Sequence, residues 1–219
     1  MSAQHEHEFE AAPGLPEKLP AGEYILWQGA PAWRSLGVSA FGLRTVAAYL
    51  LVMWLLQFAH LWDQGSSALD MAKYLGISAA CAALAWAMLA GFTYLVSSTT
   101  LYTLTNRRVV MRIGVVLGLT LNLPYRKITG ASLKPLARGT GDLALQIATD
   151  SHIAYLHLWP HARPWHFKAP QPTLRSIAHA EAVSALLLQA WRLENPTERM
   201  QVGAGAPDAP IPSSHGLMA

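Results

Sequence analysis

The sequence predicts an α+β membrane protein: a transmembrane helical hairpin, then a small antiparallel β-barrel or sandwich capped by one C-terminal amphipathic helix. Three observations predict this architecture. Two long runs lack Asp, Glu, Lys and Arg, several short runs of alternating apolar and polar residues follow them, and one apolar stripe at helical spacing comes last. Only 13% of the 219 residues are charged, against roughly 25% in an average soluble domain. Charge is therefore excluded from particular segments.

Two segments, residues 45–62 and 74–96, are predicted to be membrane-spanning helices. They contain 18 and 23 residues, which as helices measure roughly 27 Å and 35 Å at about 1.5 Å per residue. The hydrocarbon core of a bilayer is about 30 Å thick, so both segments are long enough to cross it. A buried hairpin of a soluble protein is the alternative, but core helices seldom exclude charge over such lengths.

The flanks of the two segments predict their orientation. Arginines precede and follow the hairpin, whereas the connecting loop, residues 63–73, has one lysine and two aspartates. By the positive-inside rule the loop is external and both termini are cytoplasmic. The first 30 residues carry five glutamates and no signal-peptide pattern, so the hairpin is expected to stay in the mature protein. Aromatic residues mark the two interfaces: Phe41, Trp62, Tyr74, Phe92 and Tyr94.

Two features inside the spans suggest contacts. Ala79, Ala83, Ala87 and Gly91 recur every four residues and form a small-residue stripe, along which another helix can approach closely. The stripe is expected either to seat the first span or to contact another membrane protein. His60, near the end of the first span, is a weak candidate for a pigment ligand, with a solvent-exposed histidine as the alternative.

Alternation after the hairpin predicts a sheet domain over residues 97–195, between an acidic N-terminal segment (1–44) and a disordered tail (196–219). Thr105, Asn106 and Arg107 form a tight turn between the first two strands. An amphipathic helix from Ile177 to Trp191 is expected to pack on the sheet. The predicted strands are Leu101–Thr105, Arg108–Ile113, Val115–Leu117, Thr120–Leu123, Ile128–Leu133, Leu143–Ile147 and His152–Trp159.

Four segments carry a resemblance to known families. Residues 102–114, Tyr-Thr-Leu-Thr-Asn-Arg-Arg-Val-Val-Met-Arg-Ile-Gly, resemble the signature hairpin of bacterial membrane-anchored PH domains. Residues 19–33, together with Gly-Thr-Gly-Asp at 139–142 and Tyr-Leu-His-Leu-Trp-Pro-His-Ala-Arg-Pro-Trp at 155–165, resemble the photosynthetic complex assembly proteins of purple bacteria, the PuhB family. The resemblance covers residues 8–192. It implies a PH-like fold and a protein of the inner (intracytoplasmic) membrane that helps to assemble the reaction centre and its light-harvesting antenna, with no catalytic residues.

No catalytic constellation emerges from the residues themselves. The chain has no phosphate-binding glycine loop, no Gly-x-Ser-x-Gly and no His-Glu-x-x-His. Its one cysteine, Cys81, can form neither an internal disulfide nor a cysteine-based zinc site. We therefore expect no enzyme, no cofactor and no metal.

The segment around two tryptophans is the richest candidate site. Trp159, His161, Arg163 and Trp165 are predicted to bind a protein partner, because Trp and Arg dominate the binding energy of interfaces. The alternative is that both tryptophans cover the end of the barrel. Metal binding is disfavoured, because Pro160 interrupts the spacing and no carboxylate or thiol lies close in sequence. The histidines considered for it are His152, His157, His161 and His166.

The charge is unevenly distributed. Residues 97–196 carry eleven Lys and Arg against four acids, and such a domain, tethered to the cytoplasmic face, is attracted to anionic lipid. A solvated face without a partner is the alternative, and nucleic acid is disfavoured because no nucleic-acid-binding motif is present. The residues predicted to face lipid are Arg107, Arg108, Arg112, Arg126 and Lys127.

Two functions are consistent with these observations. The first is a non-enzymatic membrane-bound assembly factor for the photosynthetic reaction centre and light-harvesting 1 complex, which docks through its PH-like domain. The second is an anionic-lipid-binding PH-like module that localises another protein. The expected partners are reaction-centre and antenna subunits and membrane lipids, and self-association is left open.

Overall fold

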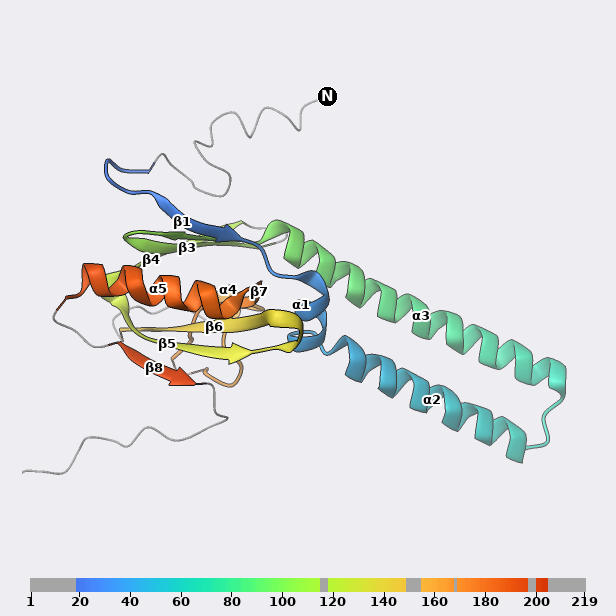
Figure 1. Cartoon of the computed structure of the whole chain (residues 1–219). Coiled ribbons are helices and arrows are strands. Elements are labelled where there is room, and N and C mark those ends of the chain that lie inside the picture. The colour runs from blue at the N-terminus through green and yellow to red at the C-terminus, as the bar shows by residue number, and fades with distance from the viewer. Residues whose placement is uncertain (1–18, 115–117, 149–154, 168, 197–199, 205–219) are drawn as a thin grey trace, which may run out of the picture.

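The computed structural model describes residues 19–114, 118–148, 155–167, 169–196 and 200–204. It has two parts, a helical hairpin and a domain of two sheets from which the hairpin projects (Figure 1). The predicted strand Val115–Leu117 lies outside the described residues.

The hairpin consists of α2 (Leu43–Asp63) and α3 (Ala68–Thr99). Both predicted helical segments are confirmed as helices, each extended at its ends. The Ser67 hydroxyl caps α3 by accepting a hydrogen bond from the Asp70 backbone N–H at 3.2 Å. Both helices are long and apolar enough to cross a membrane, and only 6% of the most apolar window of α2 and 0% of that of α3 is buried. Such exposure is unlike that of a core helix.

The two helices pack through one face that excludes the small-residue stripe. Two indole N–H groups donate hydrogen bonds across the hairpin, Trp54 to the Leu75 carbonyl and Trp86 to the Leu43 carbonyl, each at 3.1 Å. All four stripe residues are exposed: Ala79, Ala83, Ala87 and Gly91. Because all four are exposed, they do not form the buried part of the contact with α2, and their contact with another membrane protein stays a prediction.

The first sheet has the order β1-β2-β3-β4 and is antiparallel throughout. Its strands are β1 (Ile25–Gly29), β2 (Leu101–Thr105), β3 (Arg108–Ile113) and β4 (Leu119–Pro124). The predicted turn between β2 and β3 is confirmed. Strand β1 was not predicted, because Ile25–Gly29 shows little alternation. Its pairing with β2 makes part of the segment 1–44 a component of the sheet domain and not a separate segment.

The second sheet has the order β7-β6-β5-β8. Its strands are β5 (Ile128–Pro135), β6 (Thr140–Ile147), β7 (Thr173–Ala178) and β8 (Gln201–Ala204), with short 3-10 turns η1 (Tyr125–Lys127) and η2 (Ala137–Gly139) beside β5. Strand β8 is parallel to β5, so this part of the predicted disordered tail forms a strand instead. Among the described strands no pair connects the two sheets, so of the two predicted alternatives, barrel or sandwich, the closed barrel does not form.

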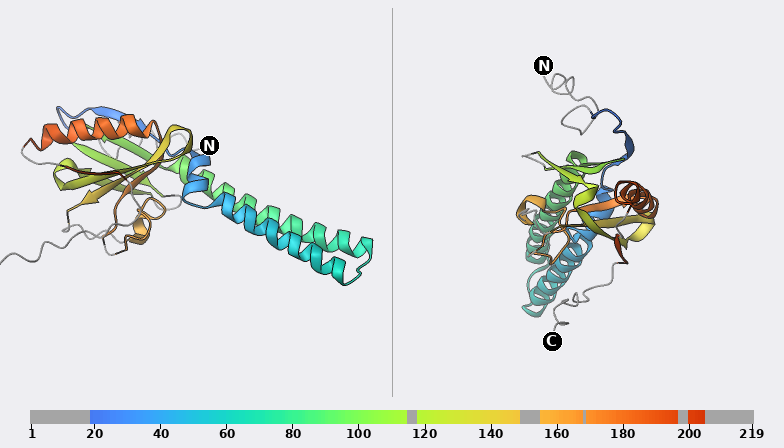
Figure 2. Two further views of the ribbon diagram at one scale, coloured as in Figure 1. Left: turned by 60° about the horizontal axis from the view of Figure 1, so that its bottom comes forward. Right: turned by 90° about the vertical axis from the view of Figure 1, so that its left-hand side faces the viewer.

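The two sheets and α5 (Ala180–Glu194) share one hydrophobic core. Figure 2 shows α5 packed against the two sheets. Ala180, Val183, Leu187, Ala190 and Trp191 are buried, as the predicted helical face requires. The helix begins three residues later than predicted. The preceding residue, His179, has a φ of 51°, and the chain before it is extended as β7.

A short helix, α4 (Tyr155–Leu158), replaces the last predicted strand. The Trp159 N–H donates a helical hydrogen bond to the Tyr155 carbonyl at 3.1 Å. The prediction was wrong because two leucines at period two fit a strand and one turn of helix equally well. The start of that predicted strand, residues 152–154, lies outside the described residues.

Helix α1 (Trp33–Ser39) joins the hairpin to the sheet domain. The Ser97 hydroxyl at the end of α3 donates to the Pro31 carbonyl at 2.6 Å, and the Ala32 N–H donates to the Ser176 carbonyl of β7 at 2.9 Å. A Cβ on Gly37 would lie 2.5 Å from the Leu43 Cδ1 of α2, so α1 needs glycine at this close approach. These contacts join the two parts firmly rather than through a flexible linker.

Candidate functional site

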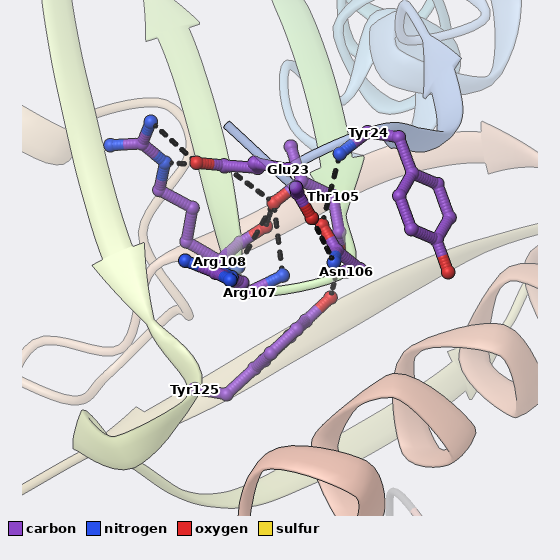
Figure 3. Close-up of polar contacts among 8 residues, drawn as sticks. Glu23, Tyr24, Thr105, Asn106, Arg107, Arg108 and Tyr125 are labelled. Carbon is purple, nitrogen blue, oxygen red and sulfur yellow. Dashed lines mark hydrogen bonds and ion pairs between the residues drawn. The ribbon is translucent and has the colours of Figure 1, made fainter. Parts of the chain in front are cut away.

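The turn of the β2–β3 hairpin binds a buried carboxylate from the N-terminal segment (Figure 3). Arg108 donates from Nε to Glu23 Oε1 at 2.7 Å and from Nη2 to Oε2 at 3.0 Å, and the Thr105 hydroxyl donates to Oε1 at 2.8 Å. Only 3% of the Glu23 side chain is exposed. A two-point guanidinium–carboxylate pair of this kind is strong and geometrically specific. The prediction that Arg108 faces lipid is therefore wrong, since its charge is used inside the protein.

Asn106 and Tyr125 complete this polar cluster. The Asn106 side chain accepts from the Tyr24 N–H and donates to the Gly22 carbonyl, each at 3.0 Å. The Tyr125 hydroxyl donates to the Thr105 carbonyl at 2.7 Å. Burial, with smaller contributions from nearby acids, raises the pKa of Tyr125. The most recognisable motif of the sequence therefore fastens the N-terminal segment to the sheet.

Three of the predicted lipid-facing residues form an exposed basic end of the domain: Arg107, Arg126 and Lys127. Strand β2 begins directly after α3 and runs away from the hairpin, so its turn lies at the opposite end of the domain (Figure 1). The Tyr125 N–H donates to the Arg107 carbonyl at 3.2 Å and places η1 beside that turn. Arg112 is half-buried and pairs in register with Leu101 at the α3 end. The five residues predicted to face lipid therefore lie in different places, three of them at the exposed basic end.

The second candidate site is organised around the buried imidazole of His161. Its Nδ1 lies 2.6 Å from the Tyr102 hydroxyl and its Nε2 lies 3.2 Å from the Thr100 hydroxyl. The Tyr102 oxygen accepts from the Arg175 N–H at 3.1 Å, and the Thr100 hydroxyl donates to the Val96 carbonyl at 2.7 Å. These roles fit a neutral ring protonated on Nε2. Burial, and secondarily Arg175, lowers the pKa of His161 to about 3.

A buried ion pair supports the same segment. Arg175 donates from Nη1 to Asp142 Oδ2 at 2.9 Å, and the Ser176 N–H donates to Asp142 Oδ1 at 2.7 Å. The guanidinium also donates to the Pro160 carbonyl at 3.2 Å and to the Ala162 carbonyl at 3.3 Å. Sequence reasoning gave Asp142 no pairing role and did not single out Arg175. The segment Thr-Leu-Arg-Ser-Ile-Ala at 173–178 shows no apolar alternation, so it gave no local signal for a buried arginine.

The four predicted partner-binding residues have different environments. His161 is buried, and Arg163 donates to the Gln171 side chain at 3.0 Å. Trp159 stacks on Phe92 of α3 with ring centroids 6.3 Å apart. Trp165 is 81% exposed and has a φ of 65°. The ring centroids of Trp165 and Phe167 lie 6.3 Å apart in an edge-to-face arrangement, and Phe167 is 61% exposed. We call Trp165 and Phe167 the exposed aromatic pair.

The described residues give little support to the pigment and metal alternatives. His60 lies in the last turn of α2 with its Nε2 3.1 Å from Gln64 Nε2. The His166 Nδ1–H donates to the Pro164 carbonyl at 2.8 Å. Within the described part of the chain no three His, Cys, Asp or Glu side chains are grouped for a metal. His152 and the side chain of His157 lie outside it.

Three comparisons relate the chain to known proteins. A family model described as "Bacterial PH domain" matches residues 38–191. A protein of Rhodobacter capsulatus named "Uncharacterized 23.7 kDa protein in puhA 5'region" is 35% identical over 189 residues, which cover 86% of this chain and 88% of that protein. A crystal structure of a DUF1696 family protein with a pleckstrin-homology domain from Shewanella loihica is 13% identical, covers 42% of this chain and 71% of its own, and gives a TM-score of 0.29.

Proposed function

The chain belongs to the bacterial PH domain family, and from this premise we propose that it is a membrane-bound, non-enzymatic assembly factor of the PuhB type. The proteins that it helps to assemble are the subunits of the photosynthetic reaction centre and light-harvesting 1 complex. The Rhodobacter capsulatus relative is named for the puhA 5' region, and the family that residues 155–165 resemble has the same puh designation. Together these names support a photosynthetic role.

The observation that carries the proposal is the projecting hairpin. The apolar surface of α2 and α3 is almost entirely unburied, and exposing such surface to water costs about 25 cal/mol per Å². A bilayer removes that cost. The hairpin then spans the inner (intracytoplasmic) membrane as a multi-pass anchor, with both termini and the PH-like domain on the cytoplasmic side, where Arg34 and Arg44 precede the first span.

Two exposed features can contact the assembling complex. The exposed aromatic pair, Trp165 and Phe167, presents large rings of the type that dominates protein interfaces. The small-residue stripe on α3 faces away from α2 and is open to a helix of a membrane subunit. Contacts in the bilayer and above it suit a protein that guides newly inserted subunits.

The polar chemistry of the domain supports binding rather than catalysis. The two buried carboxylates among the described residues, Glu23 and Asp142, are each paired with an arginine. Among the described residues every buried side-chain nitrogen and oxygen has a hydrogen-bond partner. None of these buried side-chain groups is an unpaired nucleophile or general base. We therefore assign the domain neither a reaction nor a cofactor.

The alternative function, an anionic-lipid module that localises another protein, is favoured by the exposed basic end. That end, however, lies opposite to the side from which the hairpin leaves (Figure 1). With the hairpin in a bilayer, Arg107, Arg126 and Lys127 point away from that bilayer, whose surface potential decays within about 10 Å. The basic end is better placed for an acidic region of a protein.

A deletion strain tests the proposal. Loss of the gene is expected to lower the level of reaction centres while pigment synthesis continues, because pigment-making enzymes do not need the anchor. The measurement is the reaction-centre absorbance of isolated membranes beside extracted pigment, with the gene restored as a control. Normal reaction-centre levels in the deletion strain contradict the assembly function.

A further inference from the structure

Five aromatic side chains from helices α1 and α3 and from two loops lie where the hairpin leaves the domain. They form the base cluster: Trp33, Phe41, Phe92, Tyr94 and Trp159. The ring contacts form two groups, the pair Trp33–Tyr94 and a trio in which the Trp159 ring centroid lies 5.7 Å from Phe41 and 6.3 Å from Phe92. Four members are between 38% and 58% exposed although they contact one another. The cluster is therefore an outward-facing surface and not a core.

The base cluster lies at the depth of a membrane–water interface. Tyr74, exposed near the loop end of α3, is 18 positions from Phe92 and 20 from Tyr94, or roughly 27–30 Å at about 1.5 Å per residue. A hydrocarbon core is about 30 Å thick. Trp62, 71% exposed at the end of α2, marks the same far interface. The aromatic residues thus form two belts with the spacing of a bilayer.

Basic groups accompany the base cluster. Arg34 and Arg44 are exposed at the start of the hairpin, and the Arg34 Cζ lies 5.3 Å from the centre of the Trp33 ring. A guanidinium over an indole ring suits the headgroup layer, where the ring contacts acyl chains and the cation contacts phosphate. This surface has the charge and the ring chemistry of a lipid interface.

We infer that Trp159, although it belongs to the sheet domain, lies in the headgroup layer of the bilayer and seats the PH-like domain on phospholipid. Its segment is fixed from the domain side, because the Arg175 guanidinium donates to the carbonyls of Pro160 and Ala162. The segment just before α1 is fixed to α3 at the same end through the hydrogen bond from the Ser97 hydroxyl to the Pro31 carbonyl. The domain therefore stands on the membrane in one orientation, with its basic end outward. This inference rests on the membrane-spanning part of the proposed function and not on its photosynthetic part.

The experiment places a fluorescent probe at three positions of the full chain. Cys81, the only cysteine, is replaced (Cys81→Ala), and Trp159→Cys, Trp62→Cys or Arg126→Cys is labelled with NBD. Each protein is reconstituted alone into phosphatidylcholine–phosphatidylglycerol nanodiscs with or without lipid carrying a spin label at carbon 5. Quenching constants at positions 159 and 62 are expected to exceed that at position 126 at least threefold.

Each outcome discriminates between the parts of the account. Quenching at position 62 without quenching at 159 overturns the inference and preserves the spanning hairpin. Quenching at neither position overturns both.

Because a labelled cysteine could disturb the stacking on Phe92, Trp159→Phe in the otherwise natural chain supplies a second measurement with brominated lipids. The Trp159→Phe variant is expected to show a lower quenched amplitude of the intrinsic tryptophan fluorescence. Trp27→Phe, in the half-buried β1, is the control and is expected to leave that amplitude unchanged. Equal amplitudes in the two variants contradict the inference.

Discussion

The two ends of the PH-like domain have opposite chemistry. The end that faces the hairpin is aromatic, with Trp159 stacked against Phe92, and the far end is basic, with Arg107, Arg126 and Lys127 exposed. Each end is supported by one carboxylate–guanidinium pair, Asp142–Arg175 near the hairpin and Glu23–Arg108 at the far end. Under the proposed membrane anchoring, the difference implies that a basic PH-like domain need not turn its basic residues toward the membrane that holds it.

Removing the carboxylate of the hairpin-facing pair is expected to have the largest effect. Asp142→Ala leaves Arg175, whose side chain is only 8% exposed, as a buried charge without its partner. Breaking a buried pair in this way costs about 3–5 kcal/mol. Urea unfolding of the protein in nanodiscs measures the loss, and a loss below 1 kcal/mol shows that the pair does not support this end.

The far-end pair is expected to be weaker. Glu23→Gln keeps the shape of the side chain but removes the charge that Arg108 binds, and Arg108 is 26% exposed to water. Hydrogen bonds to charged groups contribute about 1.5–3 kcal/mol, so we expect a loss of unfolding free energy of that size. If the same urea measurement gives Glu23→Gln a larger loss than Asp142→Ala, the ranking of the two ends is wrong.

The hairpin-facing end should also respond to pH. The pKa of His161 is about 3 in the folded protein, against 6.5 for the ordinary group, so the unfolded chain binds the extra proton below pH 6.5. Stability is therefore lost as pH falls from 6.5 toward 3, by up to about 1.4 kcal/mol per pH unit. Between pH 7 and pH 5 we expect a loss of about 2 kcal/mol from this group. His161→Gln should flatten that slope, and an equal slope in the variant contradicts the assignment.

The smallest effect is expected at the basic end. Replacing Arg107, Arg126 and Lys127 by Glu removes no hydrogen bond of those side chains that the described structure shows, so the unfolding free energy should change by less than about 0.5 kcal/mol. Membrane retention should be unchanged, because the hairpin and Trp159 provide it. Sedimentation of the variant with membranes from cells measures retention. Release of the variant into the soluble fraction would favour the lipid-module alternative.

Sequence reasoning predicted what is local and missed what is distant. Charge exclusion located α2 and α3, and the Thr105–Arg107 turn located the β2–β3 hairpin, because each signal lies within one segment. Glu23 and Arg108 are 85 positions apart, and no local pattern indicates that they pair. The same holds for His161, whose neighbours Thr100 and Tyr102 precede it by about 60 positions. The roles predicted for Arg108 and His161 were therefore wrong, and the partner-binding role of Trp165 stays a prediction.

The most direct test of the assembly function is site-specific photo-crosslinking in membranes of cells that are assembling reaction centres. A photoreactive residue is placed at Trp165, in the exposed aromatic pair, and at Ala185, an exposed position of α5 that serves as the matched control. Adducts are identified by mass spectrometry. The account predicts adducts with a reaction-centre or antenna subunit at position 165 and none at position 185, whereas a position 165 that yields only lipid adducts, or none, contradicts it.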